Sequence, residues 1–86
     1  MSNEQKNRTT VEIYGQRYVI LSKESSSHVQ QVAALVNDKM REISAKNPFL
    51  DVTKLAVLTA VNAVNDYINL KEQLERLREE LNKEKD

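Results

Sequence analysis

The chain has 86 residues, with one histidine, no cysteine, and 13 acidic residues balanced by 13 basic ones. A chain this short buries little of its own surface, so it needs disulfides, a metal or a partner chain for stability. The missing thiols exclude disulfides and thiolate metal sites, and His28 alone does not form a zinc site. Oligomerisation is the remedy that remains.

The composition also excludes several classes of partner. A net charge of zero gives no general attraction to nucleic acid or to anionic membranes. No apolar run approaches the ~20 residues of a membrane span, and the polar start of the chain lacks the apolar core of a signal peptide. We therefore expect a cytoplasmic protein that needs no cofactor and binds neither nucleic acid nor membrane.

The N-terminal part predicts a β-hairpin. Residues 1–8 form a polar lead-in that we expect to be flexible. Residues 9–14 and 17–21 are rich in β-branched and aromatic side chains, which are typical of strands. The dipeptide Gly15-Gln16 between them suits a type II′ turn, because glycine readily adopts the positive φ of the first turn position.

This turn sets the register of the predicted hairpin and sorts its side chains. It would pair Ile13 with Tyr18 and Val11 with Ile20, all four on the core side. Tyr14 would then point outward, where it is a contact either for a partner protein or for a second chain.

An amphipathic helix follows a serine-rich loop. Ser27 and Gln30 fit a capping box at its start. Its apolar residues recur at spacings of three and four, so they form a stripe that can cover the hairpin. The stripe consists of Val29, Val32, Ala33, Val36, Met40 and Ile43. Asn47 ends the helix, because Pro48 disfavours the α conformation in the residue before it.

A second, long helix is predicted from Val52 to about Lys85, with Asp51 as its N-cap. Residues 55–70 are apolar on nearly every side, and the small head covers only one of those sides. Residues 70–84 keep a single row of leucines, the seam of a coiled coil. The same heptad continues backwards into the head through Tyr67, Ala63, Ala60 and Ala56, and Asn62 is added because an asparagine in this apolar segment needs a hydrogen-bonding partner within the assembly. The predicted oligomer interface comprises Ala56, Ala60, Asn62, Ala63, Tyr67, Leu70, Leu74, Leu77 and Leu81.

The fold class is therefore α+β: an N-terminal β-hairpin, a short amphipathic helix, and one long helix ending in a coiled coil, in an obligate oligomer. Residues 9–69 would form a small head with a dimerisation core, and residues 70–86 a coiled-coil tail. Leucine at both seam positions specifies the number of chains weakly. A dimer, or a dimer that pairs into a tetramer, both fit, and the charges beside the seam mildly favour parallel pairing.

Catalytic patterns are missing from the sequence. His28 follows three serines, but these are consecutive capping residues on a surface turn and not a nucleophile with a positioned base. A single glycine does not make a phosphate-binding loop. We therefore expect no enzymatic activity.

Two segments of the chain carry a resemblance to a known family. VEIYGQRYVI, residues 11–20, resembles the N-terminal hairpin of the ZapA family of bacterial cell-division proteins. AVLTAVN, residues 56–62, resembles the leucine-x-alanine-x-asparagine opening of its long helix. The order of elements over residues 9–85 also matches, with a shorter coiled coil than some relatives have.

The resemblance implies a function that periodicity does not. It implies binding to FtsZ, the tubulin-like GTPase that polymerises at mid-cell, with cross-linking and bundling of its protofilaments and promotion of Z-ring assembly. FtsZ is expected to be acidic, so cations of the head are the expected contact surface. These are Arg17, Lys39, Arg41, Lys46 and Lys54. The competing interpretations are a solvated face on a scaffold for another cytoplasmic protein, and a small nucleic-acid-associated dimer, which the neutral charge disfavours.

Overall fold

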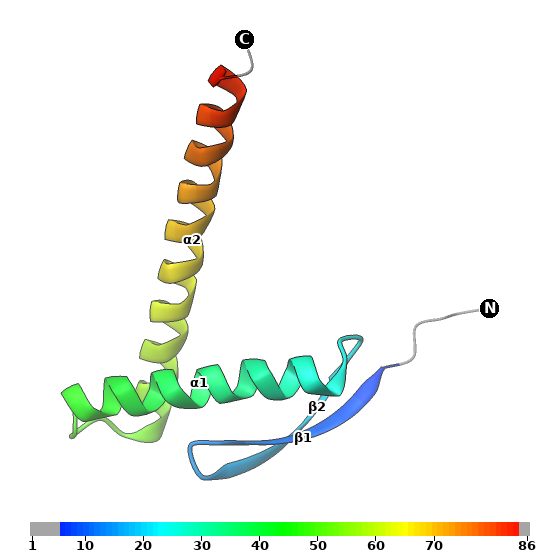
Figure 1. Ribbon diagram of the computed structural model, residues 1–86. Coiled ribbons are helices and arrows are strands. Elements are labelled where there is room, and N and C mark those ends of the chain that lie inside the picture. Colours follow the sequence, from blue (N-terminus) through cyan, green and yellow to red (C-terminus); the bar gives the residue numbers. More distant parts are fainter. Residues whose placement is uncertain (1–5, 85–86) are drawn as a thin grey trace.

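The computed structural model describes residues 6–84, in which a hairpin is followed by two helices (Figure 1). The elements are β1 (Asn7–Ile13), β2 (Gln16–Ser22), α1 (Ser26–Lys46) and α2 (Val52–Glu84). This order confirms the predicted α+β class. β1 begins two residues before the predicted start of the hairpin, and the first five residues of the expected flexible lead-in lie outside the described part of the chain.

The hairpin turn consists of Tyr14 and Gly15, so the predicted Gly15-Gln16 turn is wrong. Both residues have positive φ, 50° and 79°, as a type I′ turn requires. Glycine takes such a φ at little cost, but tyrosine does not. The backbone N–H of Tyr14 donates to Asn37 Oδ1 at 2.7 Å, which fixes the turn against α1.

The change of turn shifts the strand register by two residues. Val11 pairs with Tyr18, and Thr9 pairs with Ile20, in place of the predicted partners. Side chains alternate between the faces of a strand, so a shift of two keeps Val11, Tyr18 and Ile20 on one face, as predicted. Tyr18 is nevertheless 47% exposed, because it borders an open groove, so its predicted place in the core is wrong. Val11 is accordingly buried, and Ile20 packs against the buried cluster.

The core lies between the hairpin and α1 and continues to the start of α2. One cluster joins Val11 to Val29 and Ala33 of α1. The second joins Met40 and Ile43 to Leu55, the first fully buried side chain of α2. The predicted stripe of α1 is thus confirmed except at Val32, which is 45% exposed because it lines an open groove beside the hairpin rather than the closed core.

The helix ends follow local capping rules. Ser25 caps α1 and accepts a hydrogen bond from the His28 N–H at 3.1 Å, so the predicted capping box at Ser27 and Gln30 is wrong. The predicted cap of α2 is confirmed, because Asp51 Oδ1 accepts from the Lys54 N–H at 2.8 Å.

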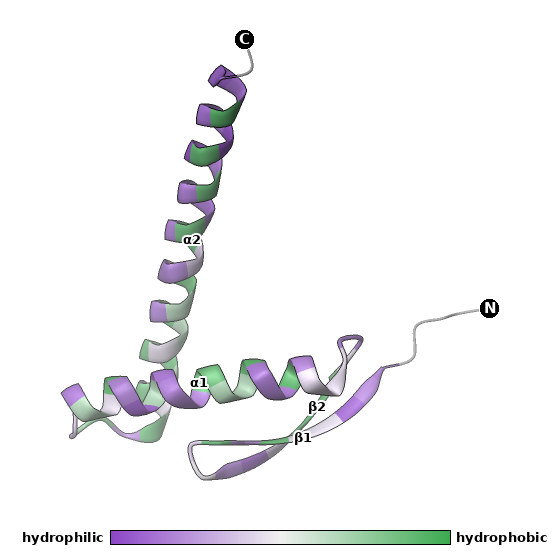
Figure 2. Ribbon diagram, viewed as in Figure 1, coloured by the Kyte–Doolittle hydropathy of each residue, from purple (hydrophilic) through white to green (hydrophobic). Residues whose placement is uncertain are grey.

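α2 leaves the head as a rod, and hydrophobic segments continue along its length (Figure 2). The Cα radius of gyration is 17.6 Å. A compact chain of this length has about 12 Å. Among the side chains of α2, only Leu55 and Thr59 are buried. The buried contacts of the rod with the head therefore lie in its first two turns, and most of its remaining surface is exposed.

Candidate functional site

The predicted seam forms a continuous exposed apolar row on α2. Its members have little contact with the head, and Leu70 is 64% exposed. Large apolar side chains in a contiguous row mark an interaction surface rather than scattered surface residues. The row consists of Ala56, Ala60, Ala63, Tyr67, Leu70, Leu74, Leu77 and Leu81.

A second apolar row on α2 was not included in the predicted interface. It repeats the same spacing of four, three and four, and its side chains are 46–60% exposed. At about 100° per residue, it lies roughly a third of a turn from the seam. The row consists of Val57, Val61, Val64 and Ile68. Its spacing is readable from the sequence, but its exposure is not, because the head had first to be placed on one side of α2.

Asn62 lies on the side of α2 that faces α1, and the seam separates it from the second apolar row. Leu55, Thr59 and Asp66 share this side through spacings of three and four, and Leu55 and Thr59 are buried there. Asn62 Nδ2 donates to the Leu58 carbonyl at 3.0 Å within the same helix. The structure therefore separates Asn62 from the alanine and leucine seam with which it was grouped.

Two open apolar grooves flank the junction of the helices. The first, of 370 Å³, lies between α1 and α2 and includes Val32, Leu35, Tyr67 and Leu70. The second, of 390 Å³, lies between the hairpin and the start of α2. Residues Tyr18, Ile20, Met40, Val52 and Ala56 line it. Residues of the predicted seam thus border both grooves. An apolar segment of a partner chain that covers the seam would therefore also fill a groove.

The predicted cations lie on different sides of the head. Lys39 Nζ is 3.2 Å from Asp66 Oδ2, so this lysine joins α1 to α2. Arg41 shares its side of α1 with Asn37 and Ser44, four residues before and three after it. Both of these bond to Tyr14, which places Arg41 beside the hairpin turn.

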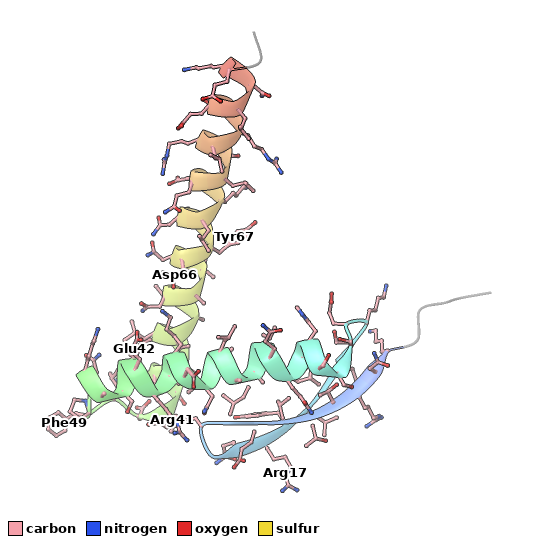
Figure 3. All side chains as sticks on the ribbon, in the orientation of Figure 1. Arg17, Arg41, Glu42, Phe49, Asp66 and Tyr67 are labelled. Carbon is pink, nitrogen blue, oxygen red and sulfur yellow. The ribbon has the colours of Figure 1, made fainter. Side chains whose placement is uncertain are left out.

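The side-chain view separates the charges in the same way. Figure 3 shows Arg41 and Arg17 on the hairpin side of α1, and Glu42 on the opposite side. Arg17 is exposed on β2, opposite Glu12. Lys46 and Lys54 are exposed at the facing ends of α1 and α2. The structure therefore places Arg17 and Arg41 on the hairpin side of α1, and Lys46 and Lys54 beside the loop that joins the helices.

Tyr14 does not point outward as predicted. Its hydroxyl lies 3.0 Å from Ser44 Oγ, and its ring packs against the cluster of Met40, Ile43 and Leu55. The predicted role as an exposed contact is wrong, because the type I′ turn directs this residue onto α1.

Of the three serines before His28, only Ser25 caps α1, whereas the Ser26 hydroxyl accepts a hydrogen bond from Thr9 Oγ1 at 2.9 Å. The Ser25 hydroxyl accepts from the backbone N–H of His28, and Glu24 Oε2 is 4.0 Å from the imidazole Nε2. Both side chains of that pair are more than half exposed, so the pair is open to solvent. Within residues 6–84, no three metal-ligating side chains converge. No helix in this range is both long and apolar enough to cross a membrane.

Comparisons with known proteins agree with the motifs of the hairpin and the long helix. The family described as "Cell division protein ZapA" matches residues 9–86. Proteins of that name from Geobacillus sp. (strain WCH70) and Bacillus subtilis (strain 168) are 63% and 57% identical over 86 residues. The alignments cover 100% of this chain, and 99% and 100% of those relatives.

A solved structure extends the likeness to the fold. The "ZapA mutant dimer from Geobacillus stearothermophilus" matches with a TM-score of 0.73 and 54% identity. The match covers 94% of both chains. The resemblance inferred from the sequence is confirmed, and the chain belongs to the ZapA family of cell division proteins.

Proposed function

We propose that the chain is a non-enzymatic adaptor of cell division, which assembles with itself and binds FtsZ through its head. In this role it cross-links and bundles FtsZ protofilaments and promotes Z-ring assembly at mid-cell. The observation that carries this proposal is the exposed apolar seam along α2 of a ZapA-family chain. Chains that associate through this seam would form an oligomer with more than one head.

The surface area of the single chain supports self-association. The accessible surface is 7451 Å². A compact protein of 9.9 kDa exposes about 5,200 Å². An excess of roughly 2,000 Å² per chain is of the size that obligate homodimers bury. A relative at 54% identity is described as a dimer, which supports the same reading.

The two parts of α2 would have different tasks in this assembly. Residues 55–70 carry both apolar rows and border both grooves, so we assign the dimerisation core to the head, residues 9–69. Residues 70–86 keep the leucine row and form the coiled-coil tail. The tail either strengthens the dimer or pairs two dimers into a tetramer.

Self-assembly is the physical basis of cross-linking. A symmetric oligomer presents each binding surface at least twice. Once one head is bound, the second binds at a high effective concentration and holds a neighbouring protofilament. Modest affinity of each head is then sufficient for bundling.

The cations of the head are the proposed contact for an acidic filament. Arg17 and Arg41 are the strongest candidates, because both are exposed on the hairpin side. Lys46 and Lys54 extend the positive surface at the junction of the helices. Lys39 is a weaker candidate, because its ammonium group already pairs with Asp66.

Charge reversal tests this function. We expect the double variant Arg17→Glu, Arg41→Glu to bind FtsZ filaments about tenfold or more weakly, since like charges would face each other at the contact. Co-sedimentation with FtsZ and GTP at two salt concentrations measures this, and wild-type binding should itself weaken at higher salt. Lys83→Glu is the control for a single charge reversal, because it changes one cation to a carboxylate near the end of α2, away from the head.

The outcomes separate the candidate functions. Unchanged binding by the double variant, with its oligomer intact, would remove these arginines from the contact. A wild-type chain that neither co-sediments with FtsZ nor raises its light scattering would overturn the FtsZ function, and would leave a scaffold for another cytoplasmic partner.

A further inference from the structure

The loop between α1 and α2, residues 47–51, carries the most exposed large apolar side chain of the described residues. Phe49 is 99% exposed, whereas no large side chain of the α2 seam exceeds 64%. Figure 3 shows its ring at the corner of the molecule, pointing away from both helices. The proposed oligomer interface therefore gives no account of this ring.

The loop that holds Phe49 is fixed at both ends. The Asn47 N–H and Nδ2 both donate to the Ile43 carbonyl at 3.0 Å, and the Leu50 N–H donates to the Asn47 carbonyl at 3.2 Å. Pro48 has a restricted φ, and Leu50 is half-buried. An ordered turn thus presents the ring outward, so binding through it costs little conformational entropy.

The charges around the loop indicate the chemistry of its partner. Lys46, the last residue of α1, and Lys54, in the first turn of α2, bracket it. The carboxylate of the loop, Asp51, is engaged as the cap of α2. An aromatic side chain within a cationic rim has the composition of a binding hot spot for an acidic surface. The same loop of a second chain would carry the same cations and repel it.

We propose that Phe49 is an anchor that inserts into an apolar pocket on an acidic surface of the FtsZ filament, an inference that rests on the FtsZ binding proposed above. The ring would supply the apolar contact, and Lys46 and Lys54 would pair with carboxylates at the rim of the pocket. Affinity would then come mostly from Phe49, and salt sensitivity from the lysines.

The test compares variants of the full chain in co-sedimentation with FtsZ filaments. We expect Phe49→Ala to bind about tenfold or more weakly with unchanged salt dependence, and Phe49→Tyr to restore most of the binding. Leu21→Ala is the matched control, since it shortens another exposed apolar side chain at the far end of the hairpin. Circular dichroism and analytical ultracentrifugation should give wild-type values, because Phe49 makes no core contact.

Each outcome decides the inference. Wild-type affinity of Phe49→Ala would refute the anchor while leaving FtsZ binding in place. A changed mass of Phe49→Ala in ultracentrifugation would also overturn it, because the ring would then belong to a contact between copies. If the wild-type chain itself does not co-sediment, the proposed function fails, and the anchor fails with it.

Discussion

Leu55 is the residue of α2 on which both α1 and the hairpin pack. It lies in the first turn of α2 and is 1% exposed, between Met40 and Ile43 of α1. Ile13 and Tyr14 of the hairpin pack against the same cluster. This one side chain therefore holds the start of α2 against both α1 and the hairpin. α2 has only one other buried residue, Thr59, so no other position of α2 makes an equivalent contact.

We expect Leu55→Ala to lower the free energy of unfolding by about 2–5 kcal/mol, because the cavity left behind adds to the lost burial. Urea denaturation at a fixed protein concentration measures this. The matched control is Leu21→Ala, a side chain that is 55% exposed, for which we expect a loss below about 1 kcal/mol. Equal losses in the two variants would mean that the junction of α2 with the head is not tightly packed.

The residue scale also shows where prediction from the sequence fails. Gly15 indicated the turn correctly, but the choice between its two neighbours depended on Asn37 and Ser44, which bond to Tyr14 from 23 and 30 residues away. The three serines before His28 posed the same difficulty, because each is a suitable cap by local preference. Local sequence limits such choices, and tertiary contacts decide them.

At the scale of elements, local signals were sufficient. The predicted start of α2 and its cap at Asp51 are confirmed, because capping depends on residues within one turn. The end of α1 before Asn47 is confirmed for the same reason. The placement of the cations was not predictable, because it depends on how α1 crosses α2. Lys39 therefore entered the predicted contact surface although it faces Asp66.

The pair of Lys39 and Asp66 gives a prediction for the contact between the helices. Their side chains are 31% and 53% exposed, so solvent screens the pair. We expect a double-mutant cycle of Lys39→Ala and Asp66→Ala to give a coupling of about 0.2–1 kcal/mol in urea denaturation. High salt should reduce this coupling, since screening weakens exposed ion pairs. A coupling of zero at low salt would show that the two charges do not interact in solution.

The single chain leaves many large apolar side chains of α2 exposed to solvent, which is energetically unfavourable. Its principal extents of 53 × 47 × 16 Å describe an angular, thin shape with a head at one end of a rod. The 33 residues of α2 span about 50 Å, and its two buried side chains, Leu55 and Thr59, both lie in the first two turns. The sequence predicted that the chain cannot cover its own long helix, because residues 55–70 are apolar on more sides than one hairpin and one helix can cover.

The two parts of the rod should respond differently to mutation. Changing Leu74 and Leu77 to glutamate places charges in the tail seam, where each leucine contributes roughly 1.5–3 kcal/mol when buried. We expect this variant to have a lower mass than wild type in analytical ultracentrifugation, while the dimer formed through residues 55–70 survives. Asn82→Glu, which adds charge beside the seam, should keep the wild-type mass. A double variant at wild-type mass would contradict an assembly role for the tail. A double variant that becomes monomeric would place the dimer contact in the tail, and would leave the apolar rows of residues 55–70 without a partner.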